Sequence, residues 1–98
     1  MQEKVFRLIV ETIVELNESL NKEALRNPTM DTALYGRHGA LDSLGLVNLI
    51  ADLEQRIRDE LGQDAILADD QAMSVLTSPF RSVRTLSAHV EKVLGQGT

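Results

Sequence analysis

Ser43 is the side chain best placed for covalent chemistry. It follows an acid at the point where an apolar helical pattern begins, in ALDSLGLVNLI, residues 40 to 50. A catalytic serine needs a general base and an oxyanion site, and His38 and Asp42 are close enough in sequence to suggest a triad. However, LDSLG lacks the first of the two glycines of a nucleophile elbow, and no period-two pattern predicts a supporting sheet. We therefore keep a minimal hydrolase only as a third hypothesis and predict that the chain is not an enzyme.

A plainer interpretation of Ser43 is that it helps to cap a helix, since a side-chain oxygen at this position can accept from a free amide of the first turn. Asp42 already fills the capping position. The serine then becomes available as an attachment point at the end of a helix. The amides and the positive dipole end of a helix N-terminus favour an attached phosphate, although the carboxylate of Asp42 opposes it.

Metal binding is not expected. The histidines, His38 and His89, lie in a predicted loop and on a late helix, without the spacing of a ligand set. The acidic pair Asp69-Asp70 does not resemble a calcium loop. The chain has no cysteine, which excludes disulfides, thiolate metal sites and a cysteine nucleophile. It also has no glycine-rich phosphate loop.

Charge narrows the class of partner. The 98 residues carry a formal net charge of −5, and residues 42 to 64 hold six acids against two arginines. An acidic surface repels nucleic acid and suits a partner with basic patches. The N-terminal stretch MQEKVFRLIVETIVEL is interrupted by charges, so we expect neither a signal peptide nor a membrane span and place the protein in the cytoplasm.

Two long helices are predicted around Ser43. Residues 3 to 21 carry an apolar stripe at helical spacing, formed by Val5, Ile9, Ile13, Leu16 and Leu20 and widened by Phe6, Val10 and Val14. Residues 42 to 61 carry a second stripe, opened by Asp42 as N-cap and closed by Gly62. The residues at helical spacing are Leu46, Leu49, Ile50, Leu53, Ile57 and Leu61.

The remaining segments complete an all-α prediction. Residues 22 to 41 form a long loop anchored by Leu34 and Tyr35. Short helical segments are expected within 67 to 83, with Ser78 and Pro79 as a favourable helix start. A last helix spans about 85 to 94 and is stopped by Gly95. We predict one domain, residues 1 to 98, built as a small four-helix bundle of three main helices plus one or two short ones around an aliphatic core.

The stretch LDSLGLVNLIADLEQRI resembles the serine region of acyl carrier proteins, and DTALYGRHGALDSL is similar to the approach loop of stand-alone carriers. The likeness spans nearly the whole chain, although an Asp-Ser-Leu triplet alone is a weak signal. It implies a four-helix bundle of the carrier type in which Ser43 is covalently modified with 4′-phosphopantetheine. The thiol of this group would hold an acyl or aminoacyl cargo as a thioester.

The resemblance also implies partners and a docking face. The partners would be a phosphopantetheinyl transferase, an acyl- or aminoacyl-loading ligase, and synthase or acyltransferase enzymes, with the carrier acting as a monomer. The implied recognition residues are Asp42, Leu44, Val47, Asp52 and Glu54. Core packing is the alternative for Leu44 and Val47, whereas Leu46 and Ala51 are expected to add an exposed apolar patch.

Two departures from the family pattern qualify the resemblance. Many fatty-acid carriers place acids soon after the triplet, but Gly45 and Asn48 are uncharged here. The stretch from 65 to 82 is also longer than usual. Both favour a specialised carrier for a polyketide, modified-lipid or aminoacyl route over housekeeping fatty acid biosynthesis, and the cargo stays open. The alternative is a helical adaptor of the same fold that never takes the prosthetic group.

Overall fold

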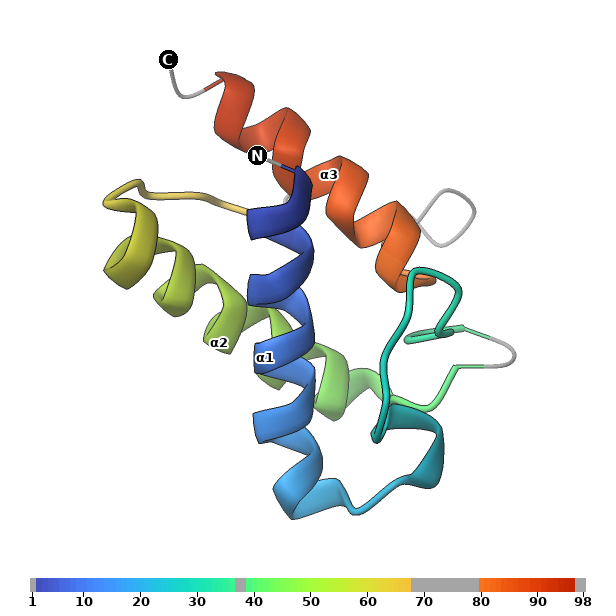
Figure 1. Cartoon of the computed structure of the whole chain (residues 1–98). Helices are drawn as coiled ribbons and strands as arrows, with labels where there is room; N and C mark the ends of the chain where they lie inside the picture. The colour runs from blue at the N-terminus through green and yellow to red at the C-terminus, as the bar shows by residue number, and fades with distance from the viewer. Residues whose placement is uncertain (1, 37–38, 68–79, 97–98) are drawn as a thin grey trace.

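Three α-helices and one short 3-10 turn make up the described part of the chain. The computed structural model describes residues 2–36, 39–67 and 80–96. Its elements are α1, Gln2–Leu20, η1, Glu23–Leu25, α2, Ser43–Leu61, and α3, Val83–Gln96 (Figure 1). Within these ranges the only β features are two isolated bridges, so the predicted all-α class is confirmed.

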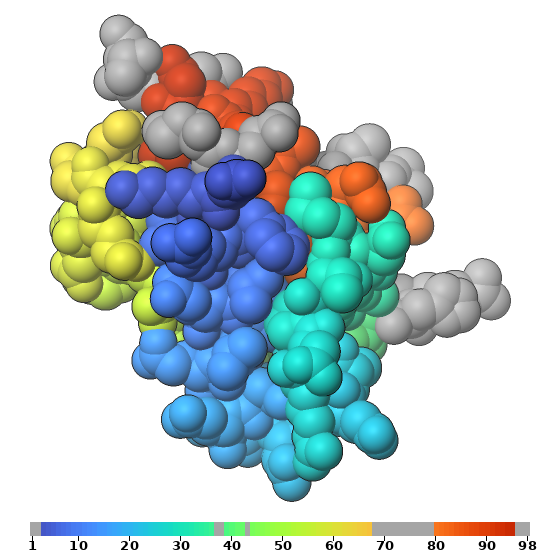
Figure 2. Space-filling model, in the orientation of Figure 1, coloured from blue at the N-terminus to red at the C-terminus, as the bar shows by residue number. Residues whose placement is uncertain are grey.

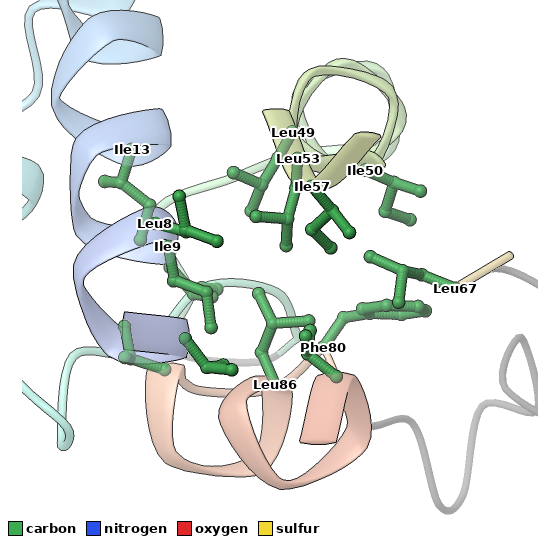
Figure 3. Close-up of a cluster of buried hydrophobic side chains, with 14 of the residues drawn as sticks. Leu8, Ile9, Ile13, Leu49, Ile50, Leu53, Ile57, Leu67, Phe80 and Leu86 are labelled. Atoms are coloured by element: carbon green, nitrogen blue, oxygen red, sulfur yellow. The ribbon is translucent and has the colours of Figure 1, made fainter. Parts of the chain in front are cut away.

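α1 is the helix that the other two share, because it packs against both α2 and α3. No Cα atom of α2 lies within 8 Å of a Cα atom of α3. The space between α2 and α3 is filled instead by Leu67 and Phe80, which lie between Ile50 of α2 and Leu86 of α3 (Figure 3). The bundle is therefore held together through α1 and through this pair of connecting side chains.

The core is aliphatic apart from Phe80, as composition predicted. Each helix contributes its inward stripe, and the described parts of the connections add six further buried side chains. These six are Leu25, Leu34, Leu41, Ala65, Leu67 and Phe80. A buried aliphatic side chain contributes about 1.5–3 kcal/mol relative to an exposed one, so the connections take part in holding the bundle together.

The apolar stripe of α1 is rotated relative to the prediction. Val5, Ile9 and Ile13 are buried as expected, but Val14 is 42% exposed. The buried face extends instead to the other side, through Leu8 and Thr12. Thr12 can be buried because its hydroxyl donates to the carbonyl of Leu8 at 2.6 Å, which satisfies the polar group inside the core. Phe6, Val10, Leu16 and Leu20 are partly buried.

α2 ends at Leu61, directly before Gly62, as the sequence predicts. Gly62 adopts the left-handed backbone conformation with φ 68°, and its N–H donates to the carbonyl of Arg58 at 3.0 Å. A side chain would be strained at this φ, which is why glycine is favoured after a helix. The predicted helix of 42 to 61 therefore differs from the observed one only in that Asp42 is the cap and Ser43 the first helical residue.

α3 begins earlier and ends later than predicted. Its cap is Ser82, whose Oγ accepts from the N–H of Thr85 at 3.2 Å, while Thr85 Oγ1 accepts from the N–H of Ser82 at 3.0 Å. Gly95 does not stop the helix, which continues through it to Gln96. The short helical segments expected within 67 to 83, including the Ser78-Pro79 start, lie largely outside the described residues.

The connection from α1 to α2 is more ordered than the predicted loop of 22 to 41. It contains η1, and Leu34 is fully buried while Tyr35 packs partly against the core, so both predicted anchors are confirmed. Figure 2 shows this connection in teal, packed along one side of α1, with the yellow end of α2 on the other side. The loop thus reaches the start of α2 by passing over the bundle rather than away from it.

None of the helices in the described ranges is both long enough and apolar enough to cross a membrane.

Candidate functional site

The first turn of α2 carries the residues that sequence singled out. Asp42 has an extended backbone, φ −87° and ψ −175°, and its Oδ1 accepts from the N–H of Gly45 at 2.7 Å. The carbonyl of Asp42 accepts the N–H of Leu46 at 2.9 Å, which starts the helical ladder. The predicted N-cap is confirmed, so the backbone of Ser43 enters the helix as its first residue without having to cap it.

Gly45 has a local packing reason for being a glycine. It is buried, and a Cβ there would lie 3.2 Å from Asp42 Oδ1 and 3.3 Å from Leu41 Cδ2. These separations are tighter than ordinary van der Waals contact, so a larger side chain would push on the cap. An acid at position 45 would therefore meet Asp42 and Leu41, whereas Asn48 is exposed and has room for one.

Backbone hydrogen bonds fix the approach to residue 43. The N–H of Leu41 donates to the carbonyl of Leu34 at 2.8 Å, and the N–H of Leu34 donates to the carbonyl of Arg81 at 2.8 Å. The N–H of Tyr35 donates to the carbonyl of Phe80 at 3.1 Å. Residues 33 to 35 therefore lie between the approach to α2 and the approach to α3, as the two isolated bridges also show.

The same loop caps α3 through the main chain. The N–H groups of Val83 and Arg84, which have no partner within their own helix, donate to the carbonyls of Thr32 and Met30 at 3.0 and 2.9 Å. The guanidinium of Arg84 adds an ion pair with Asp31 at 2.9 Å. The start of α3 and the approach to residue 43 are thus parts of one hydrogen-bonded unit, formed by residues 30 to 36, 39 to 41 and 80 to 84.

Gly39 should tolerate no side chain. A Cβ at this position would lie 2.5 Å from the carbonyl oxygen of Leu34 and 2.7 Å from the Cα of Tyr35, both backbone atoms that cannot rotate away. We expect Gly39→Ala to lower the free energy of unfolding by about 1–3 kcal/mol, the usual cost of overpacking. Urea denaturation followed by circular dichroism measures this.

Gly95→Ala is the matched control for Gly39→Ala. No atom lies within 4 Å of a Cβ at Gly95, and alanine is a better helix former than glycine. The control should leave stability unchanged or raise it. Equal stability of the two variants would contradict the close approach of Gly39 to the backbone of residues 34 and 35.

The outer face of α2 is apolar near residue 43. Leu44 is 70% exposed and Val47 is 54% exposed, so core packing, the alternative for both residues, is wrong. Ala51 is also exposed, as expected, but Leu46 is buried at 2% and does not belong to the patch. Leu44, Val47 and Ala51 follow one another at helical spacing and are here called the α2 patch.

Acidic side chains border the α2 patch. A groove of about 330 Å³ runs between α1 and α2, lined by Thr12, Glu15, Asp52, Gln55, Arg56, Asp59 and Glu60. Arg56 forms an ion pair with Glu15 across this groove, and Arg58 forms one with Asp64. Both arginines of residues 42 to 64 therefore form ion pairs with acids of this same chain. The side chains of Asp52, Asp59 and Glu60 are exposed.

Glu54 has a structural contact that sequence did not predict. It is half-buried, and its Oε2 accepts from the N–H of Leu67 at 2.8 Å. This bond joins residues 13 positions apart, and neither its existence nor its partner has a signal in the sequence pattern. The role of Glu54 in partner recognition stays a prediction.

Other chemistry receives little support from the described ranges. No group of three His, Cys, Asp or Glu side chains is placed to hold a metal ion in residues 2–36, 39–67 and 80–96. His38 lies outside these ranges, so the structure does not test the triad with Asp42 and Ser43. The carboxylate of Asp42 is engaged with the amide of Gly45.

Comparison with family models, with curated proteins and with solved structures returns no match to this chain.

Proposed function

We propose that this protein is a carrier that holds acyl or aminoacyl intermediates on 4′-phosphopantetheine attached to Ser43. The observation that carries the proposal is the first turn of α2. Asp42 caps the helix, which leaves Ser43 free of that task, and the two large apolar residues that follow at the helix surface are exposed rather than packed. Exposed apolar side chains beside Ser43 suit an attachment site that several enzymes must reach. The fold is accordingly proposed to be the four-helix bundle of the carrier type.

The residues present fit an attached phosphodiester. Ser43 is the first residue of α2, where the free amides and the helix dipole favour an anion by about 0.3–1 kcal/mol at the surface. Asp42 already accepts the amide of Gly45, and its carboxylate opposes the phosphate. The net local effect is small, so this chain supplies a place of attachment rather than a binding pocket. When bound, the group supplies a flexible thiol that holds the cargo as a thioester.

Attachment of the prosthetic group to Ser43 is a transfer from coenzyme A. The oxygen of the Ser43 hydroxyl forms a bond to the phosphorus that carries pantetheine in coenzyme A. The bond between that phosphorus and the bridging oxygen of the pyrophosphate breaks, and adenosine 3′,5′-bisphosphate leaves. The hydroxyl proton passes to a base of the phosphopantetheinyl transferase. The chain needs no general base of its own for this step, which agrees with the weak case for a triad.

The surface of α2 supports the expected partners. The α2 patch gives an apolar contact beside Ser43, and the exposed acids Asp52, Asp59 and Glu60 suit cationic side chains on the partner. We infer that the transferase, the loading ligase and the synthase or acyltransferase enzymes of one biosynthetic route dock here. The carrier acts in the cytoplasm as a monomer and serves a specialised polyketide, lipid or aminoacyl pathway.

A helical adaptor that is never modified is the second candidate. The absence of acids at Gly45 and Asn48 favours it, because a transferase that relies on early acids would bind this chain poorly. An adaptor would bind its partner equally well with a serine or an alanine at position 43.

Intact-mass analysis tests the carrier proposal. The purified chain is incubated with coenzyme A and with each of several phosphopantetheinyl transferases of broad specificity. We expect a mass gain of one phosphopantetheinyl group, located by peptide mapping to the peptide that contains Ser43. A known carrier in the same reactions controls for transferase activity. If that control is modified while this chain is unchanged with every transferase, the adaptor is the better explanation.

A further inference from the structure

The chain turns back along α2 after the helix ends. Residues 62 to 67, here called the strap, follow α2 in the reverse direction (Figure 1). The Nε of Arg58 contacts Asp64 Oδ1 at 2.8 Å, and the N–H of Leu67 reaches Oε2 of Glu54 at 2.8 Å. Residues 65 and 66 therefore lie beside α2 between the levels of Glu54 and Arg58.

The backbone of Leu67 is hydrogen-bonded to two helices, α2 and α3. Its N–H donates to Glu54 of α2, and its carbonyl lies 2.7 Å from Nε2 of His89 of α3. Because a carbonyl only accepts, Nε2 of His89 carries the hydrogen and donates it. The Leu67 side chain is fully buried, and the His89 ring packs edge-on against Phe80 with centroids 5.8 Å apart. The end of the strap is thus held by two polar bonds and by the core.

Ile66 is the exception within the strap. Its neighbours Ala65 and Leu67 are buried, whereas Ile66 is 73% exposed, more than any other large apolar side chain in the described ranges. Alternate residues of an extended segment point to opposite sides, so burial of 65 and 67 fixes Ile66 on the outside. An apolar side chain on a fixed backbone loses little conformational freedom on binding, which favours its use as a contact.

We propose that Ile66 is a second apolar anchor of the surface on which enzymes acting at Ser43 dock. The inference rests on the proposed function and adds to it a residue from the strap. The strap contacts α2 at Glu54 and Arg58. These two residues continue the helical spacing of Val47 and Ala51, so they lie on the same side of α2 as the α2 patch. Ile66 thus extends the α2 patch toward the far end of the helix.

The distances suit one interface. At about 1.5 Å per helical residue, the level of Ile66 lies about 20 Å along α2 from residue 43. A standard interface covers about 800 Å² on each partner, a disc about 32 Å across. An interface of this size is therefore wide enough to include residue 43, the α2 patch and Ile66. Its complementary surface has an apolar socket for Ile66 and, across the α2 patch, cationic side chains that face Asp52, Asp59 and Glu60 beside the groove between α1 and α2.

Steady-state kinetics of the transferase test the proposal. The probe is a broad-specificity phosphopantetheinyl transferase with saturating coenzyme A, and the varied substrate is the full chain as wild type, Ile66→Ser or Val14→Ser. Val14 is the matched control because it is an exposed apolar residue on α1, 42% exposed and outside the proposed surface. We expect Ile66→Ser to raise KM about fivefold to tenfold, as loss of an apolar anchor does, with kcat unchanged. Val14→Ser should leave both constants unchanged.

The outcomes separate this inference from the function on which it rests. Urea denaturation checks that both variants are folded, which surface substitutions normally are. An unchanged KM for Ile66→Ser, or an equal rise in KM for both variants, overturns the role of Ile66 while leaving the carrier function standing. No modification of the wild-type chain overturns the carrier function, and the inference with it.

Discussion

Replacement of Ser43 by alanine should abolish phosphopantetheinylation completely and leave the stability of the protein almost unchanged. The hydroxyl oxygen is the atom that forms the new bond to phosphorus, so no modified species should remain in the mass spectrum. Stability should change by less than about 0.5 kcal/mol, because Asp42 rather than Ser43 caps α2 and alanine is a good helix former. Both measurements are made on one preparation.

Asp42→Ala is the matched control for Ser43→Ala. It removes the carboxylate that accepts from the N–H of Gly45, and should lower the free energy of unfolding by about 1 kcal/mol while the attachment oxygen is retained. Asp42→Ala should still gain the group when the reaction is run to completion, although loss of an expected recognition residue slows it, so the two variants should have opposite profiles in mass and in stability. Modification that persists in Ser43→Ala would place the group on another residue. A stability loss in Ser43→Ala as large as that in Asp42→Ala would mean that Ser43 takes part in the cap.

Replacement of Phe80 by alanine should have the largest effect on stability, with a loss of about 3–5 kcal/mol in the free energy of unfolding. Phe80 is fully buried and is the sole aromatic side chain among the buried residues of the described ranges. With Leu67 it fills the space between α2 and α3, whose backbones do not approach each other (Figure 3). Because α2 and α3 each pack against α1, they cannot easily move toward each other to fill the cavity that alanine would leave.

Phe6→Ala controls for loss of an aromatic ring as such. Phe6 lies on α1 and is only partly buried against the core, so its removal should cost clearly less than removal of Phe80. Urea denaturation of both variants measures the difference. Similar losses for the two would show that α2 and α3 can approach each other when Phe80 is absent, contrary to the spacing role assigned to it.

The spacing of α2 and α3 has a consequence for a carrier. Phe80 and the start of α3 are connected to the approach loop of Ser43 through the hydrogen bonds of residues 34 and 35. The strap is connected to α3 through the bond between Leu67 and His89. A partner that contacts the α2 patch and Ile66 therefore contacts both α2 and the strap, which are joined through the core. The proposed docking surface is therefore supported by tertiary packing as well as by α2.

Several features were predictable because they depend on neighbours in sequence. The helices of α1 and α2 follow from apolar spacing, the cap of α2 from Asp42, and its end from Gly62. Each of these is decided within one or two helical turns, where the preferences of single residues act directly. The anchors Leu34 and Tyr35 were identified because apolar residues in a polar loop must pack somewhere.

Local rules failed where another element decides the outcome. Val14 and Thr12 both border the stripe of α1, and only the position of α2 and α3 determines that Thr12 is buried and Val14 is not. Gly95 was expected to stop α3, but glycine permits a helix end without requiring one. The start of α3 was also displaced, because its first amides are satisfied by carbonyls of residues 30 and 32, distant in sequence.

The sequence by itself determined that the protein is helical, where α2 begins and ends, and that Ser43 opens this helix, because periodicity and capping are properties of short stretches. Only the tertiary structure decided that Leu44 and Val47 face outward, that Glu54 and His89 hold Leu67, and that Ile66 is left exposed. These features depend on which surfaces the chain covers when it turns back on itself. Burial is a property of the packed molecule, and no single stretch specifies it.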